Sequence, residues 1–252
     1  MLRKSRFFCA NVPYTTILGF TGGIASGKSS RCQHLLKIAL QKAEQPNVSL
    51  GVSYVSADQV GHSMYEPGKP CHKKILDAFG RDAVISEDGV TIDRRKLGGI
   101  VFANKAQMDK LNGILWPHFD EALLTIVEEN ASVSTLQHGN RNTLIILEAA
   151  VLIEQGFVKH CNDVWLTSCS KDEAIQRVVK RNGLSVAEAT MRIESQMTIE
   201  DRLNFLKTSG FAGSIQHFDT TDVTLEVGLK QVATAFDEYW TKKLRPMCRS
   251  VA

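Results

Sequence analysis

The sequence lacks the features that mark several classes of protein. No apolar run approaches the length that spans a bilayer, and none of the six cysteines forms a Cys-x-x-Cys pair. Irregular cysteine spacing of this kind indicates reduced thiols in a cytosolic compartment. The net charge of +3 is small, and the Lys and Arg residues are scattered along the chain. We therefore predict no membrane partner and no nucleic-acid partner.

The first eight residues are basic and contain no acid, as in a mitochondrial presequence. Only about a dozen residues precede the first predicted strand, which is short for a transit peptide. We interpret residues 1–14 as an N-terminal tail and expect a cytoplasmic protein, with mitochondrial targeting as the alternative.

Short β-prone runs alternate along the chain with helical patterns. The predicted strands are 15–20, 51–56, 143–147, 163–167 and 214–218. The predicted helices are 28–42, 73–79, 94–102, 105–129, 171–181, 185–206 and 224–243. We expect a helix interruption around Trp116-Pro117 and a polar loop over 131–142. This alternation predicts an α/β fold with a doubly wound parallel five-stranded sheet, whose ligands lie at the carboxyl ends of its strands.

The segment Gly22-Gly-Ile-Ala-Ser-Gly-Lys-Ser29 lies between the first strand and the first helix. In that context Gly-x-x-x-x-Gly-Lys-Ser is a specific signal for a phosphate-binding loop. Its glycines let backbone N–H groups surround a β-phosphate at the helix N-terminus. Lys28 can bridge the β- and γ-phosphates, and the Ser29 hydroxyl is placed to bind Mg²⁺. We predict a P-loop kinase-like, ATP-dependent phosphotransferase whose ATP contacts in the loop are Gly22, Gly23, Ile24, Ala25, Ser26, Gly27, Lys28, Ser29 and Ser30.

Asp58 directly follows the second predicted strand. A carboxylate there can take the proton of an attacking hydroxyl as a general base, or hold Mg²⁺ through water. It can also be a helix N-cap, because a helical turn follows. Spacing alone leaves these roles open.

A continuous apolar run, 143–147, is typical of a strand buried on both faces, and Glu148 ends it. An acid at that point in a P-loop enzyme orients the metal or its water. We therefore predict a Mg²⁺ site with Ser29 and Glu148 as ligands, and with Asp58 as a further candidate ligand. Glu154 is predicted to be a surface residue or a helix cap.

Arg177 and Arg181 are four residues apart, so they share one face of a helix, and Arg192 opens the next helical stretch. In a kinase such arginines belong to a lid that closes over the transferring phosphoryl group. We predict this lid at 177–206; the alternative is a solvated helix face. The basic residues assigned to the solvated side are Lys180, Arg202 and Lys207.

The motifs follow one another in a characteristic order. They are Gly19-Phe-Thr-Gly-Gly-Ile-Ala-Ser-Gly-Lys-Ser29, Ala57-Asp58-x-x-Gly-His62-x-x-Tyr65-x-Pro-Gly68, Ile75-x-x-x-Phe79-Gly80, Asp88-Gly89, Ile92-Asp93-Arg94-x-x-Leu97, Val101-Phe102, Arg177-x-x-x-Arg181-Asn-Gly-Leu-Ser185 and Arg192-Ile-x-x-Gln196. In this order and spacing they resemble the dephospho-coenzyme A kinase family, from about Ile17 to Gln196. The departures from the family pattern are Ser56 in place of Asp, Trp116 in place of His, Ala150 in place of Pro, and 212–219 in place of the Ala-Asp…Asn pattern that helps hold adenine.

The resemblance implies transfer of the ATP γ-phosphate to the ribose 3′-hydroxyl of dephospho-CoA, with Mg²⁺ as cofactor and ATP as co-substrate. On the family pattern Asp58 is the general base, and His62 and Arg94 lie in or near the acceptor site, to which we add Arg192. The expected catalytic residues are Asp58, Lys28 and Arg181, and the expected ATP-binding residues beyond the loop are Arg177 and Arg181.

The resemblance also implies a three-part molecule with ATP and dephospho-CoA as its partners. The three parts are a nucleotide-binding core at 15–58 with 143–176 and 210–245, a helical substrate-binding region at 59–130 and a lid at 177–206. Tails are predicted at 1–14 and 246–252. We expect a monomer or a weak homo-oligomer.

Two other functions are compatible with a P-loop. Asp58-Gln-Val-Gly61 and Asn104-Lys105 suggest a GTPase-like nucleotide switch, but Gln107 stands where a guanine-binding carboxylate is needed. The other alternative is a P-loop kinase of another small acceptor, such as a nucleoside or nucleotide. The sequence discriminates against it only through the motifs of residues 57–102.

Overall fold

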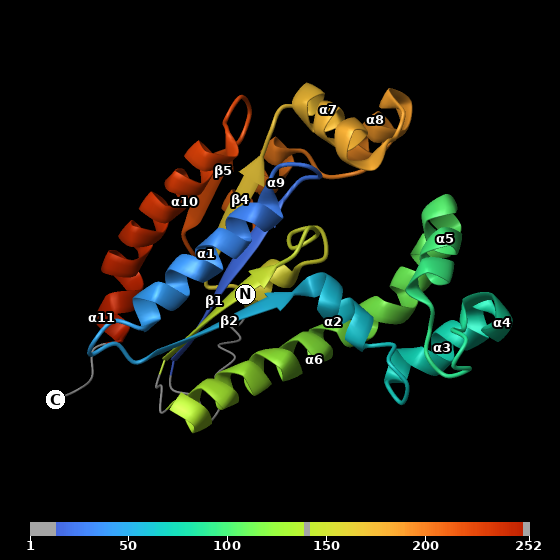
Figure 1. The fold of residues 1–252 in the computed structure, drawn as a ribbon, viewed down its shortest axis with the longest axis horizontal. Helices are drawn as coiled ribbons and strands as arrows, with labels where there is room; N and C mark the ends of the chain where they lie inside the picture. The colour runs from blue at the N-terminus through green and yellow to red at the C-terminus, as the bar shows by residue number, and fades with distance from the viewer. Residues whose placement is uncertain (1–13, 139–141, 249–252) are drawn as a thin grey trace. The chain divides into compact units, whose positions relative to one another are not determined.

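The computed structural model describes residues 14–138 and 142–248, drawn in colour in Figure 1. The predicted N-terminal tail lies outside the described residues except for Tyr14, which begins the first strand. Contacts divide the chain into two compact units. The first unit comprises the residues up to 55 and those from 129 onward, and the second comprises 56–128. No helix among the described residues is long and apolar enough to cross a membrane.

A five-stranded parallel sheet forms the centre of the first unit, which confirms the predicted fold class. Its strands are β1 (Tyr14–Gly22), β2 (Leu50–Ser56), β3 (Asn142–Glu148), β4 (Asp163–Ser168) and β5 (Ile215–Asp219). The order across the sheet is β2-β3-β1-β4-β5. Every residue of β3 is buried, as its continuous apolar run predicts for a strand covered on both faces.

The strand register brings the carboxyl ends of the strands to one edge of the sheet. Phe20 of β1 pairs with Glu148 at the end of β3, and Gly22 pairs with Thr167 near the end of β4. Ser168 in turn pairs with Asp219 at the end of β5. Ligands of such sheets bind at this edge, so the polar residues there are the candidates for a site.

Helices surround the sheet of the first unit. They are α1 (Lys28–Ala43), the 3₁₀ helix η1 (Phe157–His160), α7 (Lys171–Asn182), α8 (Val186–Glu194), α9 (Ile199–Thr208), α10 (Leu225–Tyr239), a π-helical turn η2 (Trp240–Leu244) and α11 (Arg245–Met247). α1 and α10 lie side by side (Figure 1). Between these helices and the sheet, the buried ring of Trp165 contacts Phe218 at 5.5 Å and Tyr239 at 5.9 Å between ring centroids.

The second unit is helical. Its elements are α2 (Ala57–Ser63), α3 (Pro70–Phe79), α4 (Arg81–Val84), α5 (Arg94–Ala103) and most of α6 (Lys105–His138). Asp88 organises the turn before α5, because its carboxylate accepts hydrogen bonds from the backbone of Val90 and Thr91, both at 2.9 Å. Asp93 then caps α5 by accepting from Arg95 N at 2.8 Å.

α6 is a single helix of 34 residues with Pro117 inside it, so the predicted interruption at Trp116-Pro117 is wrong. The predicted polar loop over 131–142 is also wrong as far as His138; residues 139–141 lie outside the described residues. A proline inside a helix removes one internal hydrogen bond. Burial of apolar residues spaced along one face offsets that loss. These residues are Leu111, Phe119, Leu123, Val127 and Ala131.

Two other helix predictions need correction. The helix predicted over 185–206 is two helices, α8 and α9, because Thr198 begins a new helix by accepting from Asp201 N at 3.1 Å. The last helical segment extends beyond the predicted end at 243 to Met247. Leu244 and Cys248 are buried in the core, so the described start of the predicted tail 246–252 is helical and packed.

Candidate active site

The predicted phosphate loop connects β1 to α1. The Ser26 hydroxyl donates to Gly23 O at 2.8 Å and shares a 2.7 Å hydrogen bond with the hydroxyl of Thr167. The loop is therefore hydrogen-bonded to β4 through Thr167. A Cβ atom on Gly22 would lie 2.1 Å from the Thr167 hydroxyl, so glycine is required at that position.

The loop ends in a backbone conformation that leaves the start of α1 open. Gly27, the N-cap, has φ 75°, and no side chain caps the helix. Ala25 also has a left-handed φ, 59°, which is unfavourable for a residue with a Cβ and is typical of functional loops. The first backbone N–H groups of α1 have no partner within the helix and lie at its positive dipole end. This arrangement is an anion-binding site.

Glu148 connects the start of α1 to the end of β3. Its Oε1 pairs with Lys28 Nζ and accepts from the Ser29 hydroxyl at 2.7 Å, and its Oε2 accepts from the Tyr54 hydroxyl at 2.5 Å. Burial raises the pKa of Glu148, but the hydrogen bonds from Lys28, Tyr54 and Ser29 outweigh burial and hold this pKa below its ordinary value. The carboxylate is therefore ionised beside one cation and two hydroxyl groups.

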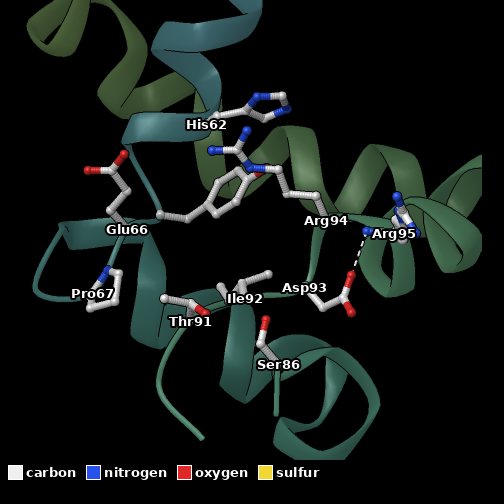
Figure 2. Close-up of a pocket in the computed structure, with 10 residues that line it drawn as sticks. His62, Glu66, Pro67, Ser86, Thr91, Ile92, Asp93, Arg94 and Arg95 are labelled. Atoms are coloured by element: carbon white, nitrogen blue, oxygen red, sulfur yellow. Dashed lines mark hydrogen bonds between the residues drawn. The ribbon is translucent and has the colours of Figure 1, made fainter. Parts of the chain in front are cut away.

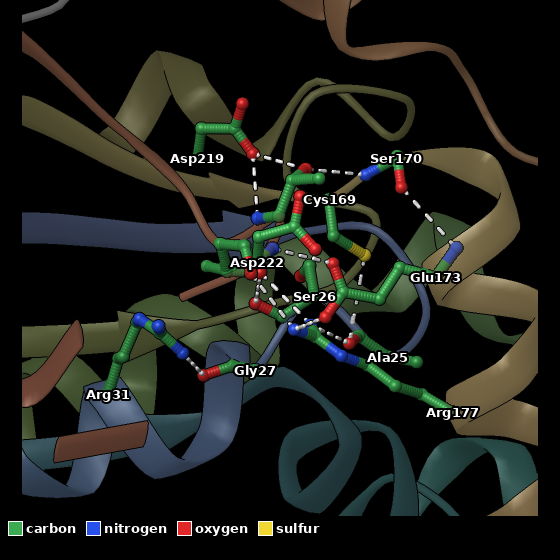
Figure 3. A network of polar contacts seen from close by, with 12 residues as sticks. Ala25, Ser26, Gly27, Arg31, Cys169, Ser170, Glu173, Arg177, Asp219 and Asp222 are labelled. Atoms are coloured by element: carbon green, nitrogen blue, oxygen red, sulfur yellow. Dashed lines mark hydrogen bonds and ion pairs between the residues drawn. The ribbon is translucent and has the colours of Figure 1, made fainter. Parts of the chain in front are cut away.

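Arg177 of α7 lies against the phosphate loop (Figure 3). One guanidinium nitrogen donates to Ala25 O and to the Thr220 hydroxyl, both at 3.0 Å. The other donates to Thr220 O at 2.9 Å and to Glu173 Oε1 at 2.5 Å. Arg177 thus joins the loop, its own helix and the segment that follows β5.

Arg31 adds a second guanidinium near the loop, also drawn in Figure 3. It is only 2% exposed and donates to Gly27 O at 3.4 Å. Burial and the charge of Arg177 both lower the pKa of Arg31. The phosphate loop is therefore flanked by two cationic side chains in addition to Lys28.

The segment between α8 and α9 also contacts the loop. Gln196 Oε1 accepts from the backbone N–H of Ile24 at 2.8 Å. Six residues further, Arg202 is 2% exposed and donates to Glu154 Oε1 through Nε at 3.2 Å and Nη2 at 2.5 Å. The assignment of Arg202 to the solvated side is therefore wrong, because this ion pair compensates its burial. Glu154 is accordingly neither a free surface residue nor a helix cap.

The second unit contains a pocket of its own (Figure 2). It is lined by His62, Tyr65, Glu66, Pro67, Ser86, Thr91, Ile92, Asp93, Arg94 and Arg95. The rings of His62 and Tyr65 meet edge to face, with centroids 5.9 Å apart. Burial and the charge of Arg94 lower the pKa of His62, against the opposite effect of Asp58. The pocket therefore combines a neutral imidazole, a phenol and a guanidinium.

Within each unit, the structure brings some of the predicted site residues together. The loop residues, Glu148 and Arg177 converge in the first unit. His62 and Arg94 line the pocket of the second unit. Other predicted residues are exposed on helices: Asp58 in the first turn of α2, Arg181 near the end of α7, Arg192 on α8 and Ser30 on α1. Ser56 occupies the N-cap of α2, which excludes the N-cap role for Asp58.

Several residues of the site carried no predicted role. Tyr54, Thr220 and Glu173 have no motif of their own, because their contacts come from strand order and from the approach of α7 to the loop. Gln196 belonged to the motif Arg192-Ile-x-x-Gln196, and that motif was the one signal that could have indicated its place.

A parallel sheet with a phosphate loop between β1 and α1, and an acid at the end of the adjacent strand, defines a P-loop kinase fold. The family model described as dephospho-CoA kinase matches residues 16–208. The chain therefore belongs to the dephospho-CoA kinase family, whose members are ATP-dependent kinases of coenzyme A synthesis.

Individual relatives agree with the family model. The chain is 34% identical to the dephospho-CoA kinase of Dehalococcoides mccartyi over 75% of this chain and 84% of the relative. It is also 34% identical to that of Lactobacillus johnsonii, with the same coverage of both chains. Among solved structures, the fold matches a dephospho-CoA kinase from Campylobacter jejuni with a TM-score of 0.56, at 20% identity, over 89% of this chain and 96% of that chain.

Proposed function

We propose that the chain transfers the γ-phosphoryl group of ATP to the ribose 3′-hydroxyl of dephospho-CoA, giving coenzyme A and ADP. In this reaction the 3′-oxygen forms a bond to the γ-phosphorus, the bond from that phosphorus to the β–γ bridging oxygen breaks, and the hydroxyl proton leaves. The observation that carries the proposal is the open start of α1 beside Lys28, Ser29 and Glu148, in a chain of this family.

The phosphate loop, Gly22 to Ser30, would hold the triphosphate of ATP. Backbone N–H groups at the start of α1 bind the β-phosphate, and Lys28 exchanges its ion pair with Glu148 for the β- and γ-phosphates. Ser29 and Glu148 offer hydroxyl and carboxylate oxygens 2.7 Å apart, the ligand type that Mg²⁺ prefers. These two residues would hold the ion, with Asp58 as the third predicted ligand. Bound Mg²⁺ would neutralise charge on the β- and γ-phosphates.

The acceptor would be bound by residues of the second unit. His62 and Arg94 face one pocket, and an imidazole with a lowered pKa can accept a hydrogen bond while Arg94 attracts phosphate groups of dephospho-CoA. Asp58 would take the proton of the 3′-hydroxyl as general base. Arg192 is the further predicted contact of the acceptor.

The lid would comprise the basic helices after β4. Arg177, already hydrogen-bonded to the loop at Ala25 O, would contact ATP from the start of the lid. Arg181, one helical turn further, would stabilise charge on the transferring phosphoryl group after closure. Both roles fit an enzyme that must keep water away from the γ-phosphate.

We also propose that the protein works in the cytoplasm as a monomer or weak homo-oligomer. The five cysteines in the described part of the chain are all free, which suits a reducing compartment.

The test of the proposed function is a side-by-side turnover assay with dephospho-CoA, AMP and nucleosides as acceptors. We expect phosphoryl transfer from ATP to dephospho-CoA, dependent on Mg²⁺ and lost on chelation. Faster transfer to AMP or a nucleoside would favour the alternative of a P-loop kinase with another small acceptor.

A paired substitution tests the general base in the same assay. Asp58→Asn keeps the shape of the side chain but cannot take a proton, so kcat should fall by about 10²- to 10⁴-fold while ATP affinity is unchanged. Asp77→Asn, at an exposed acid of the same unit, is the matched control and should leave kcat unchanged. A change confined to the Mg²⁺ dependence of Asp58→Asn would leave Asp58 a metal ligand only and would contradict its role as general base.

A further inference from the structure

The side chain of Gln196 occupies an unusual position for a residue outside the phosphate loop. It lies between α8 and α9, yet its Oε1 accepts the backbone N–H of Ile24, 172 residues away, at 2.8 Å. Ile24 is the third residue of the loop, so this N–H belongs to the backbone that is to surround the phosphates. A Cβ on the adjacent Gly23 would lie 3.7 Å from the same Gln196 oxygen.

The segment that carries Gln196 is itself fixed to the core. Arg202, in the first turn of α9, is buried and donates twice to Glu154 Oε1. Loss of Glu154 would leave the buried Arg202 without its counter-charge, so the pair holds the start of α9 in place. A Cβ on Gly23 would also lie 4.0 Å from Arg202 Nη1, so the side chains of Gln196 and Arg202 both lie against the turn at Gly23.

We propose that Gln196 is a positioning residue for phosphoryl transfer, a role that rests on the proposed function. Its carboxamide oxygen fixes the Ile24 peptide, and the Arg202–Glu154 pair fixes Gln196. Preorganised loop dipoles stabilise a transition state because they need no rearrangement when charge develops. A loop free to turn at Ile24 would bind ATP but align its γ-phosphate less well.

An opposite role would give effects of opposite sign. If Gln196 merely occupied an N–H group that a phosphate oxygen takes in the loaded enzyme, its removal would help ATP to bind. The hydrogen bond would then compete with substrate, and Gln196→Ala would lower KM for ATP without lowering kcat.

The experiment compares the full chain with Gln196→Ala, Gln196→Glu and the matched control Gln176→Ala, which removes an exposed glutamine of α7. Amide exchange of Ile24 is measured by NMR without ligand, and kcat and KM for ATP are measured with dephospho-CoA. In Gln196→Ala we expect faster Ile24 exchange and a kcat lowered about 3- to 10-fold, the value of one hydrogen bond. KM for ATP should change by less than about two-fold, since the interaction acts in the transition state.

Gln196→Glu keeps an acceptor of the same length and should retain slow Ile24 exchange, while Gln176→Ala should match the unsubstituted chain throughout. Unchanged Ile24 exchange in Gln196→Ala, or a lowered KM with unchanged kcat, would overturn the proposal. Two measurements need no acceptor: amide exchange at Ile24, and the slow hydrolysis of ATP by water, whose kcat and KM are compared among the same variants. If the chain does not phosphorylate dephospho-CoA, the proposed function is overturned. The amide exchange and the hydrolysis kinetics still decide the role of Gln196.

Discussion

At the scale of single residues, Asp163 shows how the core holds a charge. It is the first residue of β4 and has no exposed surface. Its carboxylate accepts hydrogen bonds from the Ser214 hydroxyl at 2.6 Å, from Ser214 N at 2.8 Å and from the Tyr239 hydroxyl at 2.7 Å. It also forms an ion pair with Lys243. Burial raises the pKa of Asp163, but the bonds from Lys243, Ser214 and Tyr239 outweigh burial and hold the pKa below the ordinary value of 3.8. The carboxylate thus ties β4 to β5 and to the C-terminal helices.

Because the pKa of Asp163 is lower in the folded than in the unfolded chain, its ionised carboxylate stabilises the folded state. This contribution is fully present above the unfolded-state pKa and is lost as the pH falls through the folded-state pKa. Asp163→Asn should therefore destabilise the protein by roughly 1–3 kcal/mol at neutral pH, from lost charged hydrogen bonds. The difference from the unsubstituted chain should shrink as the pH falls below 3.8 and through the lowered folded-state pKa of Asp163, because Asp163 is protonated there as well. Urea unfolding at a series of pH values measures both quantities.

Asp237→Asn is the matched control for that series. Asp237 pairs with Lys42 at 2.7 Å, but its side chain is 61% exposed, so the pair contributes little. A pH-independent difference between Asp163→Asn and the unsubstituted chain would contradict the assignment of this stability to the carboxylate charge.

At the level of elements, the three helices of the proposed lid, α7, α8 and α9, differ in how they are held. α7 and α8 pack on each other and are separated by Gly183, the C-cap of α7, whose φ of 66° is left-handed. α9 is fixed at its start by the buried Arg202–Glu154 pair. We infer that the helices from Arg177 to Glu194 move on closure, with Gly183 as the turning point, while the segment that carries Gln196 stays fixed.

Hydrogen exchange of the protein with ATP and dephospho-CoA together should slow across 177–194 and remain unchanged across α9.

Arg181→Ala should lower kcat more than it raises KM, because in the proposed role its charge acts mainly in the transition state. Lys180→Ala, on the same exposed part of α7, should be silent. A silent Arg181→Ala together with unchanged exchange across 177–194 would make α7 and α8 a static surface.

At the scale of the whole molecule, the two candidate ligand sites lie in different compact units. The phosphate loop belongs to the first unit, and the pocket with His62 and Arg94 belongs to the second. Each ligand alone should therefore raise the free energy of unfolding, by about 2.7 kcal/mol when its concentration is a hundred times its Kd.

This separation predicts a selective loss. Lys28→Ala should abolish most of the thermal stabilisation by ATP but keep that by dephospho-CoA, as measured by melting temperature with each ligand alone. It should also remove most phosphoryl transfer. Loss of both stabilisations would mean that Lys28→Ala disturbs the fold rather than the phosphate site, and near-normal turnover would contradict the role of the loop.

Local patterns accounted for most of the fold. The strands around 15–20, 51–56, 143–147, 163–167 and 214–218 were all predicted within two residues at each end. Such runs are set by side-chain periodicity and short-range signals. A helix was predicted over 105–129, but its continuity through Pro117 and its extension to His138 were not, because a proline and a polar stretch argue locally against a helix. Its apolar residues become decisive only once they are buried.

The same division applies to the site. The phosphate loop and the acid that ends β3 could be predicted from sequence, because both depend on residues adjacent in the chain and on strand–loop–helix order. Which polar groups meet depends on the packing of the folded chain. Lys28 lies 120 residues from Glu148, Arg202 lies 48 residues from Glu154, and Gln196 lies 172 residues from Ile24. A charged or amide side chain is equally acceptable in solvent or in a satisfied buried pair, so its neighbours in sequence do not distinguish the two. Packing removes the water and thereby fixes the partner.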